Sequence, residues 1–239
     1  MTLLRLESID SRHGLLQAVR DVSLEVDEGE TLALVGANGA GKTTLLRTIA
    51  GAHRATGGRI VFDGADITRV RPHRRVRMGI ALVPEGRKLF PQLTVAENLL
   101  VASAAGRAGP WNVDAVLEVF PLLRPLRSAR AASLSGGEQQ ATAIGRALMT
   151  NPRLLLLDEV SLGLAPVVVE SVYESLVHLV DRGTTLVLVE QDLGRALQVA
   201  SRVACMLEGR IVLEGAAADV TREQVTEAYF GLAPAGGSR

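Results

Sequence analysis

Short apolar segments alternate with helical patterns along most of the chain, and this alternation predicts an α/β fold with a mostly parallel sheet. Uninterrupted apolar runs of strand length mark the expected core strands, at 31–35, 80–83, 154–157 and 185–189. Two further runs, at 203–207 and 210–213, flank Glu208-Gly209, a dipeptide typical of a tight turn. Short β segments also predict an N-terminal antiparallel β subdomain, at 3–7, 22–26 and 59–63.

The segment from about 86 to 150 has a helical pattern instead. Thr94-Val95-Ala96-Glu97 is a capping box that opens one helix, residues 112–120 predict a second, and Asn151-Pro152 ends a third. We therefore expect a helical subdomain inserted between two core strands of a single domain that spans residues 1–239. A last helix begins after Thr221, and residues 233–239 are expected to form a flexible tail.

Composition limits the partners of the protein. The 239-residue chain carries 26 basic and 26 acidic side chains, so no net field draws it to nucleic acid, and we expect no nucleic-acid partner. Apolar runs stay well short of the ~20 residues that cross a bilayer, so a membrane role requires a membrane-embedded partner. The N-terminus lacks the pattern of a signal peptide, and a single cysteine, Cys205, suits a reducing cytoplasm.

A glycine-rich loop after the first core strand fits the phosphate-binding pattern G-x-x-x-x-G-K-[ST]. Its residues are Gly36, Ala37, Asn38, Gly39, Ala40, Gly41, Lys42 and Thr43. The glycines allow successive N–H groups to point inward at the start of the helix that begins near Thr44. Lys42 can reach the β- and γ-phosphates, and the Thr43 hydroxyl can ligate Mg²⁺. A chance glycine-rich turn is the alternative, and the strand before the loop and the helix after it argue against that.

Two acids follow the four-leucine strand at 154–157. Asp158 stands at the carboxyl end of this strand, where open α/β sheets bind ligands, and is expected to hold Mg²⁺. Its neighbour Glu159 can polarise the attacking water. The alternative, that both acids only cap the next helix, loses force beside the phosphate loop.

A second anion-binding pattern precedes this strand. Ser135, Gly136, Gly137 and Glu138 open a helix, so the Ser135 hydroxyl and the first N–H groups could donate to phosphate oxygens. Taken alone, the same residues are also a good helix N-cap, and this alternative stays open.

In this order, the motifs resemble the ATP-binding cassette (ABC) transporter ATPases over essentially the whole chain. The segments 83–87, 161–166 and 189–191 resemble one ATPase subunit of branched-chain amino acid importers. The resemblance implies a P-loop NTPase core and a head-to-tail dimer with two ATP molecules at the interface. It also implies a membrane permease that docks near the helical segment, at the inner face of the membrane. A heterodimer is expected in the cell.

The resemblance further implies roles for individual residues. The catalytic residues would be Glu159, Lys42 and Gln191, and the metal ligands would be Thr43, Asp158 and Glu85. ATP would also contact the phosphate loop, Thr44, His13, Glu85 and, from the other subunit, the residues 135–138. Five positions depart from the wider family: His13, Glu85, Val160, Ala165 and Gln191. Gln191 replaces a histidine and cannot carry positive charge, so slower hydrolysis is expected.

Other functions stay open at this point. One is a non-transport cassette ATPase that acts as an assembly scaffold, and another is a nucleotide-regulated module with little hydrolysis. A basic cluster, composed of Arg69, Arg71, Arg74, Arg75 and Arg77, is expected to form a solvated helix face rather than a contact with phosphates or an acidic partner.

Overall fold

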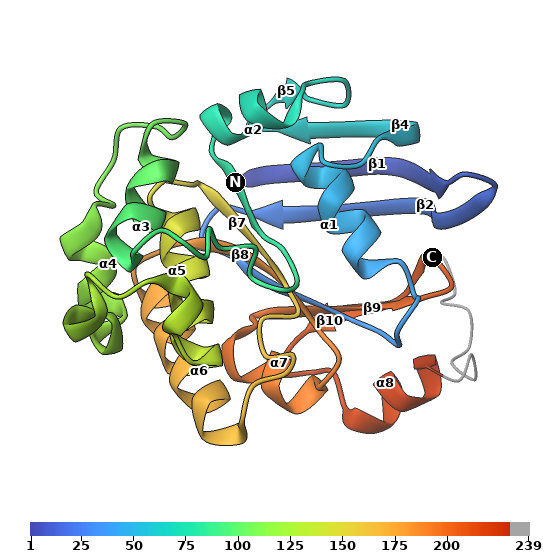
Figure 1. Ribbon diagram of the computed structural model, residues 1–239. Helices are drawn as coiled ribbons and strands as arrows, with labels where there is room; N and C mark the ends of the chain where they lie inside the picture. The colour runs from blue at the N-terminus through green and yellow to red at the C-terminus, as the bar shows by residue number, and fades with distance from the viewer. Residues whose placement is uncertain (230–239) are drawn as a thin grey trace.

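The computed structural model describes residues 1–229, which form two sheets and surrounding helices (Figure 1). The expected flexible tail at 233–239 lies outside the described residues. The larger sheet has six strands in the order β10-β9-β3-β8-β7-β6, and only β10 runs antiparallel to its neighbour. Its strands are β3 Thr31–Val35, β6 Ile80–Val83, β7 Leu154–Asp158, β8 Thr185–Glu190, β9 Arg202–Leu207 and β10 Arg210–Ala216. The predicted mostly parallel α/β sheet is confirmed.

Alternate leucines of β7 show how this sheet separates two cores. Leu154 and Leu156 pack with the apolar side chains of helix α1, Lys42–Ala50, and of the antiparallel sheet. Leu155 and Leu157 point to the opposite face, where they pack against the helical segment. All four are fully buried, so the strand is covered on both faces, as its uninterrupted apolar run predicts.

The second sheet is antiparallel and contains four strands in the order β2-β1-β4-β5. Its strands are β1 Thr2–His13, β2 Leu16–Asp27, β4 Ala55–Phe62 and β5 Ala65–Asp66. The antiparallel β subdomain is confirmed, but β1 and β2 are much longer than the segments 3–7 and 22–26. Register shifts interrupt the pairing of β1 with β2, and Ser8 and Asp21 have positive φ angles of 47° and 51°. Such bulges disturb the period-two pattern, so the sequence marked only part of each strand.

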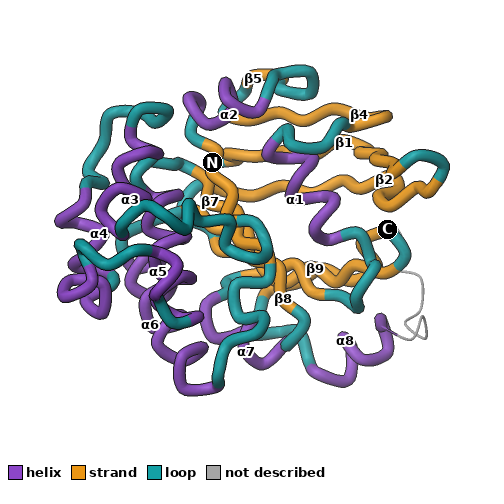
Figure 2. The backbone as a smooth tube through the Cα atoms, in the orientation of Figure 1, coloured by secondary structure: helices purple, strands orange, loops and turns teal. Residues whose placement is uncertain are grey.

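Helices from the chain between β6 and β7 gather at one end of the molecule, apart from the antiparallel sheet (Figure 2). They are α3 Val95–Ser103, α4 Val113–Val119, the 3-10 turns η1 Pro121–Leu126 and η2 Ala131–Ser133, and α5 Gly136–Leu148. The predicted capping box at Thr94 and Glu97 is present. The remaining helices are α2 Pro72–Met78, α6 Pro166–Asp181, α7 Leu193–Val199 and α8 Arg222–Tyr229.

One member of the basic cluster is not on a solvated face, and the prediction is wrong for it. Arg75 is only 3% exposed, whereas Arg69, Arg71, Arg74 and Arg77 are exposed. Its guanidinium donates to the carbonyl oxygens of the last turn of α1, Thr48 at 2.9 Å and Ile49 at 2.7 Å. Burial lowers the pKa of Arg75 to about 10. Arg75 is therefore a structural residue that satisfies the end of a helix.

Candidate active site

The glycine-rich loop joins β3 to α1 and presents an uncapped helix start. Gly41 stands at the N-cap position of α1 with φ 103°, and it provides no side chain to bond the first N–H groups. A Cβ at this position would lie 2.2 Å from the carbonyl oxygen of Ala18, so only glycine fits. The first backbone donors of α1 are thus left for a ligand, at the end of the helix where the dipole favours an anion.

Lys42 is folded back over this loop. Its ammonium donates to the carbonyl oxygens of Gly36 at 2.7 Å and Ala37 at 3.0 Å, and lies 3.9 Å from a carboxylate oxygen of Glu159. The side chain is 3% exposed, and burial lowers its pKa, while Glu159 and Asp158 act in the opposite direction. The loop therefore holds one positive charge beside the acidic pair.

The acidic pair lies directly against the start of α1. Asp158 ends β7, is 1% exposed, and one of its oxygens accepts a hydrogen bond from the Thr43 hydroxyl at 2.8 Å. Its other oxygen is buried and has no hydrogen-bond partner among residues 1–229. Burial raises the pKa of this carboxyl, against the effect of the Thr43 bond. A buried carboxylate oxygen without a donor is a site that a cation would satisfy.

Glu159 is held in a strained backbone conformation. Its φ angle is 49°, which costs a non-glycine residue about 1 kcal/mol, and its N–H donates to the carbonyl of Val189 at 3.1 Å. The side-chain amide of Gln191 donates to its carboxylate at 2.8 Å. Both contacts orient Glu159 toward the phosphate loop. Gln191 therefore bonds the Glu159 carboxylate directly.

Gly41, Lys42, Thr43, Glu159 and Gln191 line one cavity of about 500 Å³, whereas Asp158, Gly36 and Ala37 do not line it. It brings together much of the set predicted from sequence: His13, Asn38, Gly39, Gly41, Lys42, Thr43, Thr44, Glu85, Glu159 and Gln191. Sequence reasoning missed three apolar members of the lining, Leu16, Ala18 and Leu162. Leu16 and Leu162 are 65% and 50% exposed, which a sequence pattern does not reveal.

His13 lies at the rim of this cavity and is paired with a second histidine. Its ring stacks on that of His53 with centroids 4.3 Å apart, and its Nε2 lies 3.1 Å from the Thr44 hydroxyl. The pair offers more aromatic surface than one imidazole alone, and His53 was not among the predicted residues.

Glu190 was also missed. This carboxylate is 2% exposed, and one oxygen accepts from the Ser161 hydroxyl at 3.0 Å and from the N–H of Gln191 at 3.3 Å. Burial raises its pKa. It links the loop that follows Glu159 to the residue that bonds Glu159. The sequence offered one signal for Glu190: it is a charged residue at the end of an otherwise apolar strand, β8.

The residues 135–138 lie outside the cavity. The Ser135 N–H donates to the Glu138 carboxylate at 2.7 Å, and the Glu138 N–H donates to the Ser135 hydroxyl at 3.4 Å. Gly137 faces α6, where a Cβ would lie 2.2 Å from a methyl group of Val168. This helix start is a complete capping box on the surface, and one chain does not bring it to Lys42.

Comparison with known proteins decides the family. A sequence profile described as ABC transporter matches residues 19–161. The chain belongs to the ABC transporter family. This cassette is similar to the high-affinity branched-chain amino acid transport ATP-binding protein BraG of Pseudomonas aeruginosa. The two are 44% identical over 232 residues, which cover 96% of this chain and 100% of BraG.

Solved cassettes have the same fold. A nucleotide-free ATP-binding cassette from an ABC transporter has a TM-score of 0.83 and 29% identity, with 97% of this chain and 96% of that chain covered. A dimeric cassette in a post-hydrolysis state, bound to ADP and phosphate, has a TM-score of 0.80 and 25% identity. That match covers 90% of this chain and 99% of the other.

The family confirms the predicted ATP-binding cassette ATPase and its fold. Nucleotide is its ligand, and a dimer is a form that a solved relative takes. The roles of individual residues, the Mg²⁺ ligands and the preference for a heterodimer stay predictions. None of the helices within residues 1–229 has the length and apolar character of a membrane span.

Proposed function

We propose that this cassette is the ATP-hydrolysing subunit of an importer for branched-chain or related amino acids. The observation that carries the proposal is the contact of Thr43 with Asp158 at 2.8 Å, beside Lys42 and Glu159, in a chain 44% identical to BraG. ATP hydrolysis at this site would power a membrane permease, and the protein would act at the inner face of the membrane through that partner.

The residues present fit Mg²⁺ and ATP. The unpaired oxygen of Asp158, the Thr43 hydroxyl and Glu85 at the cavity wall are hard oxygen donors of the kind that Mg²⁺ prefers. When bound, Mg²⁺ would neutralise charge on the phosphates and leave the reaction to positioned groups of the chain. The uncapped start of α1 and the Lys42 ammonium would hold the phosphates, since both are positive and face the cavity.

Glu159 is proposed to orient and deprotonate the attacking water. Its carboxylate stands 3.9 Å from the Lys42 ammonium and is held from the other side by the Gln191 amide. Gln191 is neutral, so it orients the Glu159 carboxylate without neutralising its negative charge. The stacked pair His13 and His53, with Leu16 nearby, would receive the base of the nucleotide.

A second cassette would complete each site. Within residues 135–138 Ser135 is exposed and Gly137 is buried, and none of the four lines the cavity of its own chain, which supports a role against the nucleotide of a partner chain. The working dimer in the cell would be a heterodimer. The segment 86–150 would act as one subdomain and dock the permease. Its exposed apolar side chains, Phe90, Leu100 and Val101, support this surface, with 49%, 53% and 48% of each exposed.

Transport by the assembled complex tests the proposal. The protein would be reconstituted with its permease in proteoliposomes, and uptake of labelled leucine, isoleucine and valine measured with and without ATP. We expect ATP-dependent uptake of at least one of them, lost with Glu159→Gln. An ATPase active with the permease but without uptake of any amino acid would contradict the substrate class. A protein that copurifies with no polytopic membrane partner would favour the scaffold alternative.

A further inference from the structure

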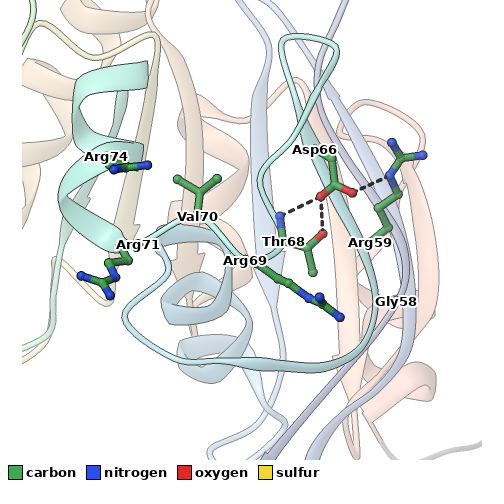
Figure 3. Close-up of a pocket in the computed structure, with 8 residues that line it drawn as sticks. All are labelled: Gly58, Arg59, Asp66, Thr68, Arg69, Val70, Arg71 and Arg74. Carbon is green, nitrogen blue, oxygen red and sulfur yellow. Dashed lines mark hydrogen bonds and ion pairs between the residues drawn. The ribbon is translucent and has the colours of Figure 1, made fainter.

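A second concave surface lies on the antiparallel sheet, between the outer edge of β4 and the start of α2 (Figure 3). The cavity measures about 970 Å³, and its lining includes Arg59, Arg69, Arg71 and Arg74. A neighbouring cavity of about 480 Å³ continues along β4 and shares Arg69 and Arg71. Together they form one groove, which we name the β4 groove, and it contains none of the residues that line the active-site cavity.

Three guanidinium groups of the β4 groove have no acidic partner in the part of the chain that the structure describes. Arg69, Arg71 and Arg74 are exposed, and within residues 1–229 their side chains make no ion pair and no hydrogen bond. One acid lines the groove, Asp66. Its carboxylate already accepts from the Thr68 N–H at 2.9 Å, the Thr68 hydroxyl at 2.7 Å and Arg59 at 3.0 Å.

The positive charge therefore concentrates in this groove, although the whole chain is neutral. The Thr68 and Arg59 bonds lower the pKa of Asp66, so this acid stays ionised and committed to those partners. Guanidinium groups present planar forks of donors that match carboxylate oxygens. The charge pattern thus favours an anionic ligand with several carboxylates or other oxyanions.

Arg75 anchors the backbone segment that carries Arg69 and Arg71. Besides the end of α1, its guanidinium bonds the carbonyl oxygens of Thr68 at 3.0 Å and Val70 at 2.9 Å. The backbone on both sides of Arg69 is therefore tied to a buried side chain that is 3% exposed. A surface held in place before binding loses less entropy when a ligand arrives.

The open edge of β4 indicates what kind of anion fits. β5 pairs with Val61 and Phe62 alone, so the outer edge over 55–60 has no neighbouring strand among the described residues. Only Ile60 has its edge groups engaged, with its N–H bonded to Thr68 and its carbonyl to Ile67, both at 2.8 Å. A sheet edge offers alternating main-chain donors and acceptors, which the backbone of an extended peptide matches better than a lipid headgroup or a nucleic acid does.

We infer that the β4 groove binds an extended acidic segment of a partner protein. Arg69, Arg71 and Arg74 pair with its carboxylates, and the free edge of β4 bonds its backbone. His53 lines the groove and also stacks on His13, but the three arginines lie outside the active-site cavity. The inference therefore does not depend on the proposed transport function. It assigns a role to the arginines that ATP hydrolysis leaves unused.

A direct binding measurement tests this. The probe is a fluorescein-labelled peptide of alternating glutamate and serine, about ten residues long, titrated with the purified full-length chain and followed by fluorescence anisotropy. Each exposed ion pair adds only a few-fold to affinity, so the triple variant R69Q/R71Q/R74Q is expected to weaken binding about tenfold. A matched triple of exposed arginines elsewhere, R127Q/R210Q/R222Q, removes the same charge and should bind within about twofold of wild type.

Several outcomes would overturn the inference. The wild-type protein could show no saturable binding of the glutamate and serine peptide. The two triple variants could lose the same affinity for it, or the wild type could bind a lysine and serine peptide equally well. Tighter binding of vesicles rich in anionic lipid, or of a single-stranded oligonucleotide, lost in the groove triple, would assign the groove to those ligands instead. Thermal unfolding and ATP hydrolysis of both triples report on folding. The single variant Arg71→Gln should show a smaller loss in the same direction.

Discussion

Two helix starts in this protein carry the residue types that bind phosphate, but within residues 1–229 only one of them lines the active-site cavity. At α1 the N-cap is Gly41, which has no side chain, so the first N–H groups face the active-site cavity without a partner from the cap. At α5 the N-cap is Ser135, and a capping box with Glu138 engages the N–H groups of Ser135 and Glu138. The first helix start is uncapped and lies at a cavity, and the second is capped and lies outside that cavity.

The difference separates two ways of recognising an anion. The loop before α1 is expected to recognise phosphate with backbone groups, because no side chain within residues 1–229 caps the start of this helix. The Ser135 hydroxyl accepts from the Glu138 N–H, and its own O–H remains available to donate. The α5 start can therefore add a contact to a nucleotide held by another chain, but it cannot replace the α1 start.

The largest effect, a loss of turnover, is expected when Glu159, the acid beside the start of α1, is substituted. Glu159→Gln keeps the shape and the bond partner of this side chain but removes the base. Turnover should fall by about 100-fold or more, while ATP binding is retained. Phosphate release and equilibrium binding measure the two quantities. Glu170→Gln, an exposed glutamate on α6, is the matched control. Turnover that survives in the Glu159 variant would remove this residue from the role of base.

A pair of glycine substitutions tests whether the uncapped start depends on close packing. Gly39 and Gly41 both have left-handed φ angles, 83° and 103°, so alanine costs each about 1 kcal/mol. An added Cβ meets nothing within 4 Å at Gly39 but collides with the Ala18 carbonyl at Gly41. Gly41→Ala should therefore lower the free energy of unfolding of the nucleotide-free protein more than Gly39→Ala, and weaken ATP binding about tenfold or more.

Chemical denaturation and calorimetry with Mg·ATP would measure both quantities. Equal destabilisation by the two alanines would show that backbone strain, rather than the contact with Ala18, limits this position.

The same contrast explains what the sequence could predict. Gly41, Lys42 and Asp158 belong to patterns in which local spacing determines local geometry, so the contact of the acidic pair with the phosphate loop was predictable. Arg75 was misjudged because its partners, the Thr48 and Ile49 carbonyls, lie far away in sequence. A single arginine in a basic run shows no pattern that marks it as buried.

Long-range packing accounts for the other omissions too. His53 stacks on His13 only because β1 and the segment before β4 lie side by side. Glu190 is buried by the strands around β8, and its bond to Ser161 joins the end of β8 to the turn after β7. The bulged ends of β1 and β2 were missed because cross-strand pairing, rather than alternation, defines them.

Asp158 allows a pH experiment on the first helix start. Burial raises its pKa, so the native protein keeps this proton to higher pH than the unfolded chain, and stability is lost as the pH rises through the folded pKa. Asp158→Asn removes that ionisation and should make the nucleotide-free protein more stable at pH values above the folded pKa, where the wild-type group has lost its proton. The same variant should lose stabilisation by Mg·ATP, since the amide supplies a weaker metal ligand.

Thermal unfolding between about pH 5 and pH 8, with and without Mg·ATP, checks both parts. A variant less stable than wild type at every pH without nucleotide would show that the carboxylate contributes more through Lys42 and Thr43 than its burial costs.

The smallest effect is expected at the second helix start, and its position in the assembly makes it informative. Ser135→Ala removes the cap and should lower the free energy of unfolding by about 1 kcal/mol, with ATP binding to a single chain unchanged because Ser135 lies outside the cavity. Ser135→Thr keeps a hydroxyl and should restore the cap. In a dimer, however, the loss of Ser135 should impair the site whose phosphate loop belongs to the other chain.

Mixed dimers of differently tagged chains separate these two roles of Ser135. With Ser135→Ala on one chain and Glu159→Gln on the other, both changes fall on one nucleotide site and the second site stays intact. With both changes on the same chain, each site carries one of them, so turnover should be lower than in the first arrangement. A cap that acts only within its own helix predicts no such difference, because the stability of each helix does not depend on which chain carries Glu159→Gln. Equal turnover in the two arrangements would therefore confine Ser135 to its capping role and leave the α1 start as the one phosphate site of the two.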